Sequence, residues 1–276
     1  MDKINLEAYF HRIGYNAIPL VNLQTLRALQ ELHTQTIPFE NLSPLFGIPV
    51  KLDIKSLQQK MITEKRGGYC FEQNNLFRDV LETIGFQVKC LEARVVFNNS
   101  SDRLPARTHM LLLVTLDENI FIVDVGFGGM TPTMPLLLKT GVRQETTLEP
   151  FRLIYDSDHY ILEAFVQENW KPLYHFDLQQ QFLIDYELKN WFVATNPASH
   201  FLTNLMISRT ANECRYALMN NQFSVHNLKK GTEKKILITV KEFREVLEDT
   251  FLLSLPDHED LDKKLEKLIE MNQQDG

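Results

Sequence analysis

The stretch RGGYCFEQNNLF, from Arg66 to Phe77, is the clearest structural signal in the first third of the chain. Gly67 and Gly68 form a turn without side chains, and Cys70 stands where that turn passes into an amphipathic segment. Apolar residues follow at helical spacing, and a glycine typical of a helix end comes after them: Phe77, Val80, Leu81, Ile84 and Gly85. The sequence therefore predicts a helix from Cys70 to about Ile84.

The hydrophobic pattern of the whole sequence predicts an α+β chain in three parts. Residues 1–85 read as helical, because Asn22 and Asp53 are candidate caps ahead of leucine- and isoleucine-rich segments at helical spacing. Residues 86–195 hold short segments rich in β-branched and aromatic residues, which predict an antiparallel sheet or small barrel: FQVKCLEARVVF, HMLLLVTL, IFIVDV, FRLIY, YILEAFV and WKPLYHF. Residues 196–276 predict a hairpin (FSVHN and KKILITV) followed by two helices.

The composition limits the class of protein. The chain has 276 residues, of which 44% are hydrophobic and 24% charged, and a formal net charge of -7. This acidic balance argues against nucleic acid or an anionic membrane as the main partner. The longest apolar run, residues 110–114, is far shorter than the roughly 20 residues that span a bilayer. The start, MDKINLEAYF, lacks the basic and apolar regions of a signal peptide. We expect a cytoplasmic protein that binds neither membrane nor nucleic acid.

The three cysteines are scattered and form no CxxC pair or cysteine/histidine ligand spacing. A disulfide framework or a metal site is therefore not expected. Cys90, in a strand-like segment, and Cys214 are expected to be small buried side chains.

Cys70 has the surroundings of a nucleophile. Only the thiolate form of cysteine attacks carbonyl groups, and the positive end of a helix dipole or a neighbouring imidazolium favours that form. Cys70 is predicted to lie at a helix start. Backbone N–H groups there can also stabilise an oxyanion. Gly67 and Gly68 would leave room for a substrate to reach the sulfur.

Eight histidines compete for the role of base. His109 differs from the others because it opens the apolar run HMLLLV directly after a polar turn. A residue at the mouth of a buried strand is held rigidly and can still face a cleft, although a lone histidine there is more often structural. Three others lie in polar helical contexts and are expected to be exposed: His11, His33 and His258. Three lie in ordinary strand-like segments, namely His159, His175 and His226, and His200 follows a turn.

Asp124 is the candidate for orienting the imidazole. It stands between Val123 and Val125 at the end of an apolar strand, where an aspartate is costly to bury unless it is paired. The separation from His109 is 124 − 109 = 15 residues, enough for two adjacent antiparallel strands joined by the turn LDEN. Without His109, the favoured interpretation of Asp124 would be a turn aspartate that bonds its own backbone. Together, Cys70, His109 and Asp124 predict a catalytic triad.

These residues belong to motifs that resemble the arylamine N-acetyltransferase family. The resemblance rests on IPFENL (37–42), RGGYCFEQN (66–74), THMLLLV (108–114) and VDVGFGG (123–129), in the family's order and at its usual separations. RGGYCFEQN is the specific signature, and the resemblance is strongest from residue 37 to 130.

The resemblance implies an N-terminal helical domain (1–85) carrying the nucleophile, a β-barrel domain (86–195) carrying histidine and aspartate, and an α/β lid (196–276). The family's triad falls on Cys70, His109 and Asp124. Acetyl-CoA would acylate the cysteine, and an arylamine or hydrazine would then attack the thioester. No metal is implied, and the chain would act as a monomer or homodimer.

The resemblance also suggests residues that contact the substrates. Phe39, Val95, Thr108, Phe127 and Phe201 are expected to contact the acceptor, although each aromatic could equally be plain core. Gly126 and Gly128 belong to the same prediction as cofactor contacts. The turn before His109 matches no cofactor-binding pattern of the family; by position alone, Arg103 and Arg107 are candidates for the nucleotide end of CoA, although exposed turn arginines are usually only solvated. Finally, Glu40 and Arg66 are expected to form a buried ion pair that supports the cysteine turn.

Other functions remain open at this stage. An amide synthase that moves a polyketide-type acyl group to an aryl amine would use the same triad on the same fold. A cysteine peptidase or transglutaminase-like enzyme would share the order of the three residues. A non-catalytic binding protein would carry an inert Cys70.

Overall fold

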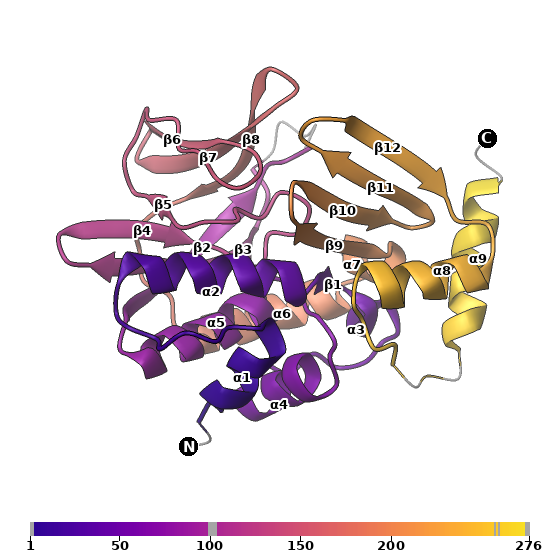
Figure 1. The fold of residues 1–276 in the computed structure, drawn as a ribbon. Helices are drawn as coiled ribbons and strands as arrows, with labels where there is room; N and C mark the ends of the chain where they lie inside the picture. The colour runs from indigo at the N-terminus through magenta and orange to yellow at the C-terminus, as the bar shows by residue number, and fades with distance from the viewer. Residues whose placement is uncertain (1–2, 99–103, 257, 259, 274–276) are drawn as a thin grey trace.

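The computed structural model describes residues 3–98, 104–256, 258 and 260–273, and places them in two antiparallel sheets and a set of helices (Figure 1). The N-terminal helices gather along one side of the two sheets. Their bounds are α1 Leu6–Ile13, α2 Leu23–Thr36, α3 Leu42–Leu45, α4 Ile54–Gln58, the π-helix η1 Gln59–Thr63 and α5 Cys70–Ile84. The helix ends predicted from the sequence are confirmed. Asn22 and Asp53 each accept a hydrogen bond from a backbone N–H of the first turn, and Gly85 ends α5 with a φ of 114°.

The larger sheet has seven strands in the order β5-β4-β3-β2-β8-β7-β6. Their bounds are β2 Gln87–Val95, β3 Arg107–Leu116, β4 Asn119–Val123, β5 Leu136–Leu137, β6 Phe151–Asp156, β7 His159–Val166 and β8 Asn169–Phe176. Residues after β5 then bond to β6 at the opposite edge, through Gly141 N–H to Leu153 O and Gln144 N–H to Phe151 O, each 2.8 Å. The sheet is thus a nearly closed barrel. The α+β class and the antiparallel barrel predicted from the sequence are confirmed.

The smaller sheet has the order β1-β9-β10-β11-β12. Its strands are β1 Phe39–Glu40, β9 Met206–Ala211, β10 Cys214–Met219, β11 Gln222–Asn227 and β12 Gly231–Ile236, and α8 Val240–Glu245, the π-helix η2 Val246–Thr250 and α9 Leu261–Gln273 follow. The hairpin of β11 and β12 is confirmed. β1 comes from the N-terminal part, so the sheet joins segments more than 160 residues apart. The division into domains at 85/86 and 195/196 stays a prediction.

One helix was missed by the sequence analysis. α6, Leu183–Thr195, follows the barrel strands, and a short helix α7, His200–Thr203, comes after it. One hydrogen bond joins α6 to the helical part, from Tyr69 Oη to Asn190, and another joins it to barrel strand β2, from Tyr186 Oη to Leu91 O (2.8 Å). Its outer face exposes large apolar residues such as Leu188 and Trp191, which hides the helical periodicity of the segment.

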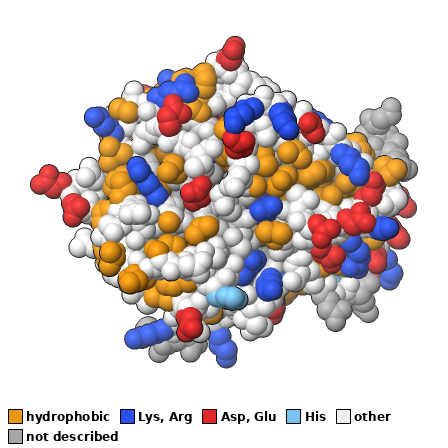
Figure 2. Space-filling model, viewed as in Figure 1, with side chains coloured by type: hydrophobic (Ala, Val, Ile, Leu, Met, Phe, Trp, Pro, Cys, Tyr) orange, Lys and Arg blue, Asp and Glu red, His pale blue; other side chains and the backbone are white. Residues whose placement is uncertain are grey.

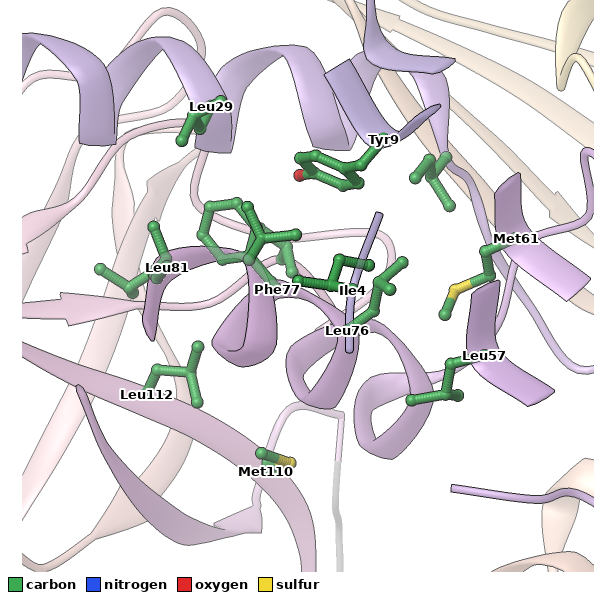
Figure 3. Close-up of a cluster of buried hydrophobic side chains, with 14 of the residues drawn as sticks. Ile4, Tyr9, Leu29, Leu57, Met61, Leu76, Phe77, Leu81, Met110 and Leu112 are labelled. Atoms are coloured by element: carbon green, nitrogen blue, oxygen red, sulfur yellow. The ribbon is translucent and has the colours of Figure 1, made fainter. Parts of the chain in front are cut away.

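The largest core cluster lies between α1, α2, α5 and the strands β3 and β4 (Figure 3). Tyr9, Leu29, Phe77 and Leu112 are fully buried in it, and they come from four of these elements. Cys70 belongs to the same cluster. The start of α5 is therefore fixed against the barrel by packing on several sides.

Charged side chains of both signs are interspersed over the face shown in Figure 2, most densely over α8 and α9. Among the described residues, no helix is long and apolar enough to cross a membrane. The cytoplasmic location and the absence of nucleic-acid and membrane partners stay predictions.

Candidate active site

Cys70 is the first residue of α5, and its thiol is buried with the residue 5% exposed. The Sγ atom lies 3.6 Å from the carbonyl oxygen of Thr108, at the start of β3. Gly67 allows the preceding turn to pass close to the chain before β1, because a Cβ at this position would stand 2.0 Å from the oxygen of Pro38. Gly67 thus allows close backbone approach, and Gly68 leaves room for the Glu72 side chain, whose Oε2 would stand 2.8 Å from a Cβ at that position.

His109 and Asp124 are joined by a hydrogen bond of 2.7 Å between Nε2 and Oδ2. They are not direct cross-strand partners: His109 lies opposite Ala93 on β2, and Asp124 follows the last residue of β4. Because Leu112 pairs with Val123, Asp124 falls two residues away from the position opposite His109 but on the same face. The expected proximity is confirmed, with a diagonal geometry.

Asp124 is completely buried, and both its oxygens are satisfied. Oδ1 accepts from Asn74 Nδ2 (3.0 Å) and from the N–H of Gly126 (2.9 Å), and Oδ2 also accepts from Tyr174 Oη (3.2 Å). These donors stabilise a carboxylate rather than a carboxylic acid. Asn74 and Tyr174 were not among the residues predicted from the sequence. Asn74 stands four residues after Cys70, on the same face of α5, which is a signal that could have found it.

The charges of this pair depend on each other. Burial alone would lower the pKa of His109, but the Asp124 carboxylate, its hydrogen bond and the nearby Cys70 raise it to about 10. Burial would raise the pKa of Asp124, but His109 and the donors Asn74 and Gly126 hold it below its ordinary value. With Nε2 engaged by Asp124, the other ring nitrogen, Nδ1, is the one left for the thiol. The arrangement can hold an imidazolium next to a thiolate.

A buried ion network lies beneath the cysteine turn. Arg66 donates to Glu40 Oε1 from Nε (3.1 Å) and Nη2 (2.7 Å), and the N–H of Leu42 donates to Oε2 (2.6 Å). Lys60 donates to Glu72 (2.6 Å), whose other oxygen accepts the N–H of Tyr69 (3.1 Å). The side chains of Glu40 and Glu72 are at most 1% exposed. Burial would raise the pKa of Glu40, but Arg66 and Lys60 lower it.

The predicted acceptor residues fall into two groups around this centre. The Phe39 ring lies 6.0 Å from that of Phe201, which in turn lies 5.4 Å from the ring of Tyr69, the residue before Cys70. The Phe127 ring stands edge to face with His109 at 5.2 Å. Val95 ends β2 opposite Tyr174, so it lies on the strand next to His109. All five predicted acceptor residues, Thr108 included, are half-buried.

Gly126 and Gly128 have structural reasons to be glycines. A Cβ on Gly126 would stand 2.7 Å from Cys70 Cα, so only glycine lets the loop after Asp124 approach α5. Gly128 has a φ of 92°, which other residues rarely adopt, and lies over the Phe39 ring. Their expected contact with the cofactor stays a prediction.

Arg107 is not a freely solvated arginine. It lies in β3 and bonds Glu92 (3.0 Å) and Asp177 (2.7 Å). A cavity of about 420 Å³ opens beside Arg107, and Thr108 and Phe192 also line it. Arg103, the other candidate arginine of this turn, lies outside the described residues.

Two of the three histidines expected in exposed helical contexts differ from that prediction: His258 is half-buried outside a helix, with its ring 4.9 Å from that of Phe46, and His33 differs most. His33, expected to be exposed, is completely buried between Gln73 and Tyr9. Its Nε2 lies 2.6 Å from Gln73 Oε1, and its Nδ1 lies 2.9 Å from Tyr9 Oη. Burial lowers the pKa of His33 to about 4, so the ring is neutral. The Gln73 amide in turn donates to the carbonyl of Pro38 (2.8 Å), which holds the chain before β1 against the cysteine turn.

Comparison with known proteins places this geometry in a family. A family model described as N-acetyltransferase matches residues 22–260. The arylamine N-acetyltransferase of Mycobacterium tuberculosis (strain ATCC 25618 / H37Rv) is 41% identical over 258 residues, covering 92% of this chain and 91% of the relative. The chain belongs to the arylamine N-acetyltransferase family.

Other arylamine N-acetyltransferases agree with this assignment. The Escherichia coli (strain K12) relative is 39% identical, over 91% of this chain and 90% of its own. The solved structure of the M. tuberculosis protein superposes with a TM-score of 0.92 at 39% identity, covering 96% of this chain and all of the other. The Mycobacterium marinum arylamine N-acetyltransferase, solved in complex with CoA, gives a TM-score of 0.91 at 40% identity, over 97% and 99% of the two chains. Like its relatives, the chain is an acetyltransferase.

Proposed function

We propose that this enzyme transfers the acetyl group of acetyl-CoA to arylamines, arylhydrazines or hydrazides through a thioester on Cys70. The observation that carries the proposal is the 2.7 Å contact between His109 and a buried Asp124 carboxylate, next to a thiol at a helix start. Family membership supports the acetyl chemistry. The M. marinum complex supports CoA as the carrier of the acetyl group.

In the first half-reaction the Cys70 thiolate attacks the carbonyl carbon of acetyl-CoA. The bond between carbon and Cys70 sulfur forms, and the bond between carbon and CoA sulfur breaks. The departing CoA thiolate takes the proton of the His109 imidazolium. In this proposal the N–H groups of Cys70 and Phe71, at the start of α5, stabilise the negative oxygen that forms in between, since the N–H groups of Glu72 and Gln73 already donate to Tyr69 O.

In the second half-reaction the neutral acceptor nitrogen attacks the thioester carbon. The carbon–nitrogen bond forms, the carbon–sulfur bond to Cys70 breaks, and His109 takes the proton that the nitrogen releases. This step restores the thiolate and the imidazolium, and the negative charge of Asp124 stabilises the imidazolium. The rings of Phe39, Phe201 and Phe127 form the wall for a flat aromatic acceptor.

Initial-rate kinetics test the proposal. If acetyl-CoA and an aromatic amine are varied together, a double-displacement reaction gives parallel double-reciprocal lines, because CoA leaves before the amine reacts. Intersecting lines would contradict the covalent intermediate. The same assay with longer acyl thioesters tests the alternative: an amide synthase would prefer the larger acyl group, and our proposal expects acetyl-CoA to react fastest.

A further inference from the structure

The IPFENL segment places three consecutive side chains at the site. Phe39 faces Phe201, and Glu40 holds Arg66 beneath the cysteine turn. The next residue, Asn41, is completely buried, and the mechanism above gives it no role.

Asn41 bonds a part of the chain 160 or more residues away. Its Nδ2 donates to the carbonyls of Phe201 (3.0 Å) and Asn204 (2.7 Å), and its Oδ1 accepts the N–H of Met206 (2.7 Å). These partners fix the orientation of the amide, because a flipped side chain would set its oxygen against two carbonyl oxygens. No other uncharged side chain of this size could provide the same two donors and one acceptor.

The bonded segment carries one wall of the acceptor site. Phe201 is the second residue of the four-residue helix α7, which is too short to hold its own position. β9 begins at Met206 and pairs with β1, with Glu40 opposite Ile207. The Asn41 side chain therefore bonds Met206, the first residue of β9, just beyond the paired residues of β1 and β9. It also holds the backbone of Phe201 directly.

We infer that Asn41 is a positioning residue that gives the enzyme its preference for aromatic acceptors, because it holds the backbone of Phe201 at a fixed place opposite Phe39. This inference rests on the proposed function, since the acceptor must reach a Cys70 thioester beside these rings. An acceptor without a ring makes no use of the two phenylalanines. Asn41 therefore affects aromatic acceptors selectively and leaves acetylation of Cys70 by acetyl-CoA unchanged.

The variant Asn41→Asp tests the inference, because it keeps the shape and the bond from Met206 but turns an oxygen toward the carbonyls of Phe201 and Asn204. We expect kcat/KM for an aromatic amine to fall about tenfold relative to kcat/KM for unsubstituted hydrazine, the loss expected for one buried hydrogen-bonding group. The rate of Cys70 acetylation, measured by intact mass after rapid mixing with acetyl-CoA, stays within about twofold. Asn41→Ser, smaller and uncharged, is measured in parallel so that the result does not depend on the folding of one variant.

Two comparisons separate positioning from a general loss of structure. Asn221→Asp changes another buried side-chain amide, in the turn between β10 and β11, which donates to Leu237 O (3.3 Å), and should leave the ratio of the two acceptors unchanged. In a Phe201→Ala background, Asn41→Asp should have no further effect on that ratio, because the ring through which it acts is gone.

Three results would overturn the inference: equal losses for both acceptors, acetylation slowed as much as transfer, or effects of Asn41→Asp and Phe201→Ala that simply add. A failure of the proposed function looks different. In that case wild-type Cys70 takes up no acetyl group from acetyl-CoA, before any variant is compared.

Discussion

His109 Nε2 lies 2.7 Å from Asp124 Oδ2, and Asp124 in turn accepts hydrogen bonds from Asn74, Gly126 and Tyr174. The carboxylate is completely buried, so these contacts replace the water it would bind at a surface. Asn74 and Gly126 come from α5 and from the loop after β4, the two places that also surround Cys70. The orientation of the imidazole and the position of the thiol therefore depend on the same contacts.

Replacing Asp124 by Asn should abolish most of the activity while leaving the shape of the site. The neutral amide can no longer stabilise the imidazolium of His109, so the thiolate form of Cys70 loses its partner. We expect kcat/KM to fall by roughly 10³-fold or more. Alkylation of Cys70 by iodoacetamide at pH 6 should slow in parallel. Unchanged alkylation would contradict the role given to Asp124.

The His109–Asp124 pair should make stability depend on pH in the alkaline range. The pKa of His109 is raised from 6.5 to about 10, so between these values the unfolded chain has lost a proton that the folded chain keeps. The contribution is fully present below pH 6.5 and is lost as pH rises through 10. Urea unfolding from pH 6 to 10 should show stability falling with pH, less steeply in His109→Gln. Equal slopes in both proteins would refute this.

Gly126→Ala should slow the acetylation of Cys70 more than the addition of one methyl group suggests. The new Cβ would lie 2.7 Å from Cys70 Cα, so the loop after Asp124 must move away from α5. We expect acetylation of Cys70 to slow by about 10²-fold, because small displacements of reacting groups are costly. Gly129→Ala is the matched control, since nothing lies within 4 Å of its Cβ. If both variants react equally fast, the close approach has no catalytic importance.

Glu40→Gln should destabilise the fold by about 3 kcal/mol, because it leaves the guanidinium of Arg66 buried without its carboxylate. The exposed pair of Arg143 and Glu145 gives the control: Glu145→Gln should change the free energy of unfolding by less than about 1 kcal/mol. Denaturant unfolding measures both. A similar small change in the two variants would show that the buried pair contributes little.

The start of α5 was predictable because its signals are local: two glycines, an apolar stripe and Gly85 as the stop. The neighbourhood of His109 and Asp124 was also predictable, because a fifteen-residue separation with a short turn brings two strands together. Tyr174 was not, since nothing in the sequence shows that β8 pairs with β2, the neighbour of β3.

His33 shows a signal that was present but overlooked. It follows Leu26 by seven residues and Leu29 by four, so helical spacing places it on the buried face of α2. Its polar neighbours in sequence suggested exposure instead. The role of Asn41 could not be foreseen, because its partners lie more than 150 residues further along the chain.

A covalent acetyl group on Cys70 can be detected by intact-mass spectrometry after brief mixing with acetyl-CoA, without an acceptor, on wild type and Cys70→Ala. Our account predicts that the wild type alone gains about 42 Da, the mass of one acetyl group on a cysteine nucleophile, and that an aromatic amine removes it. A wild type that gains no mass, or a Cys70→Ala variant that gains the same mass, would contradict it.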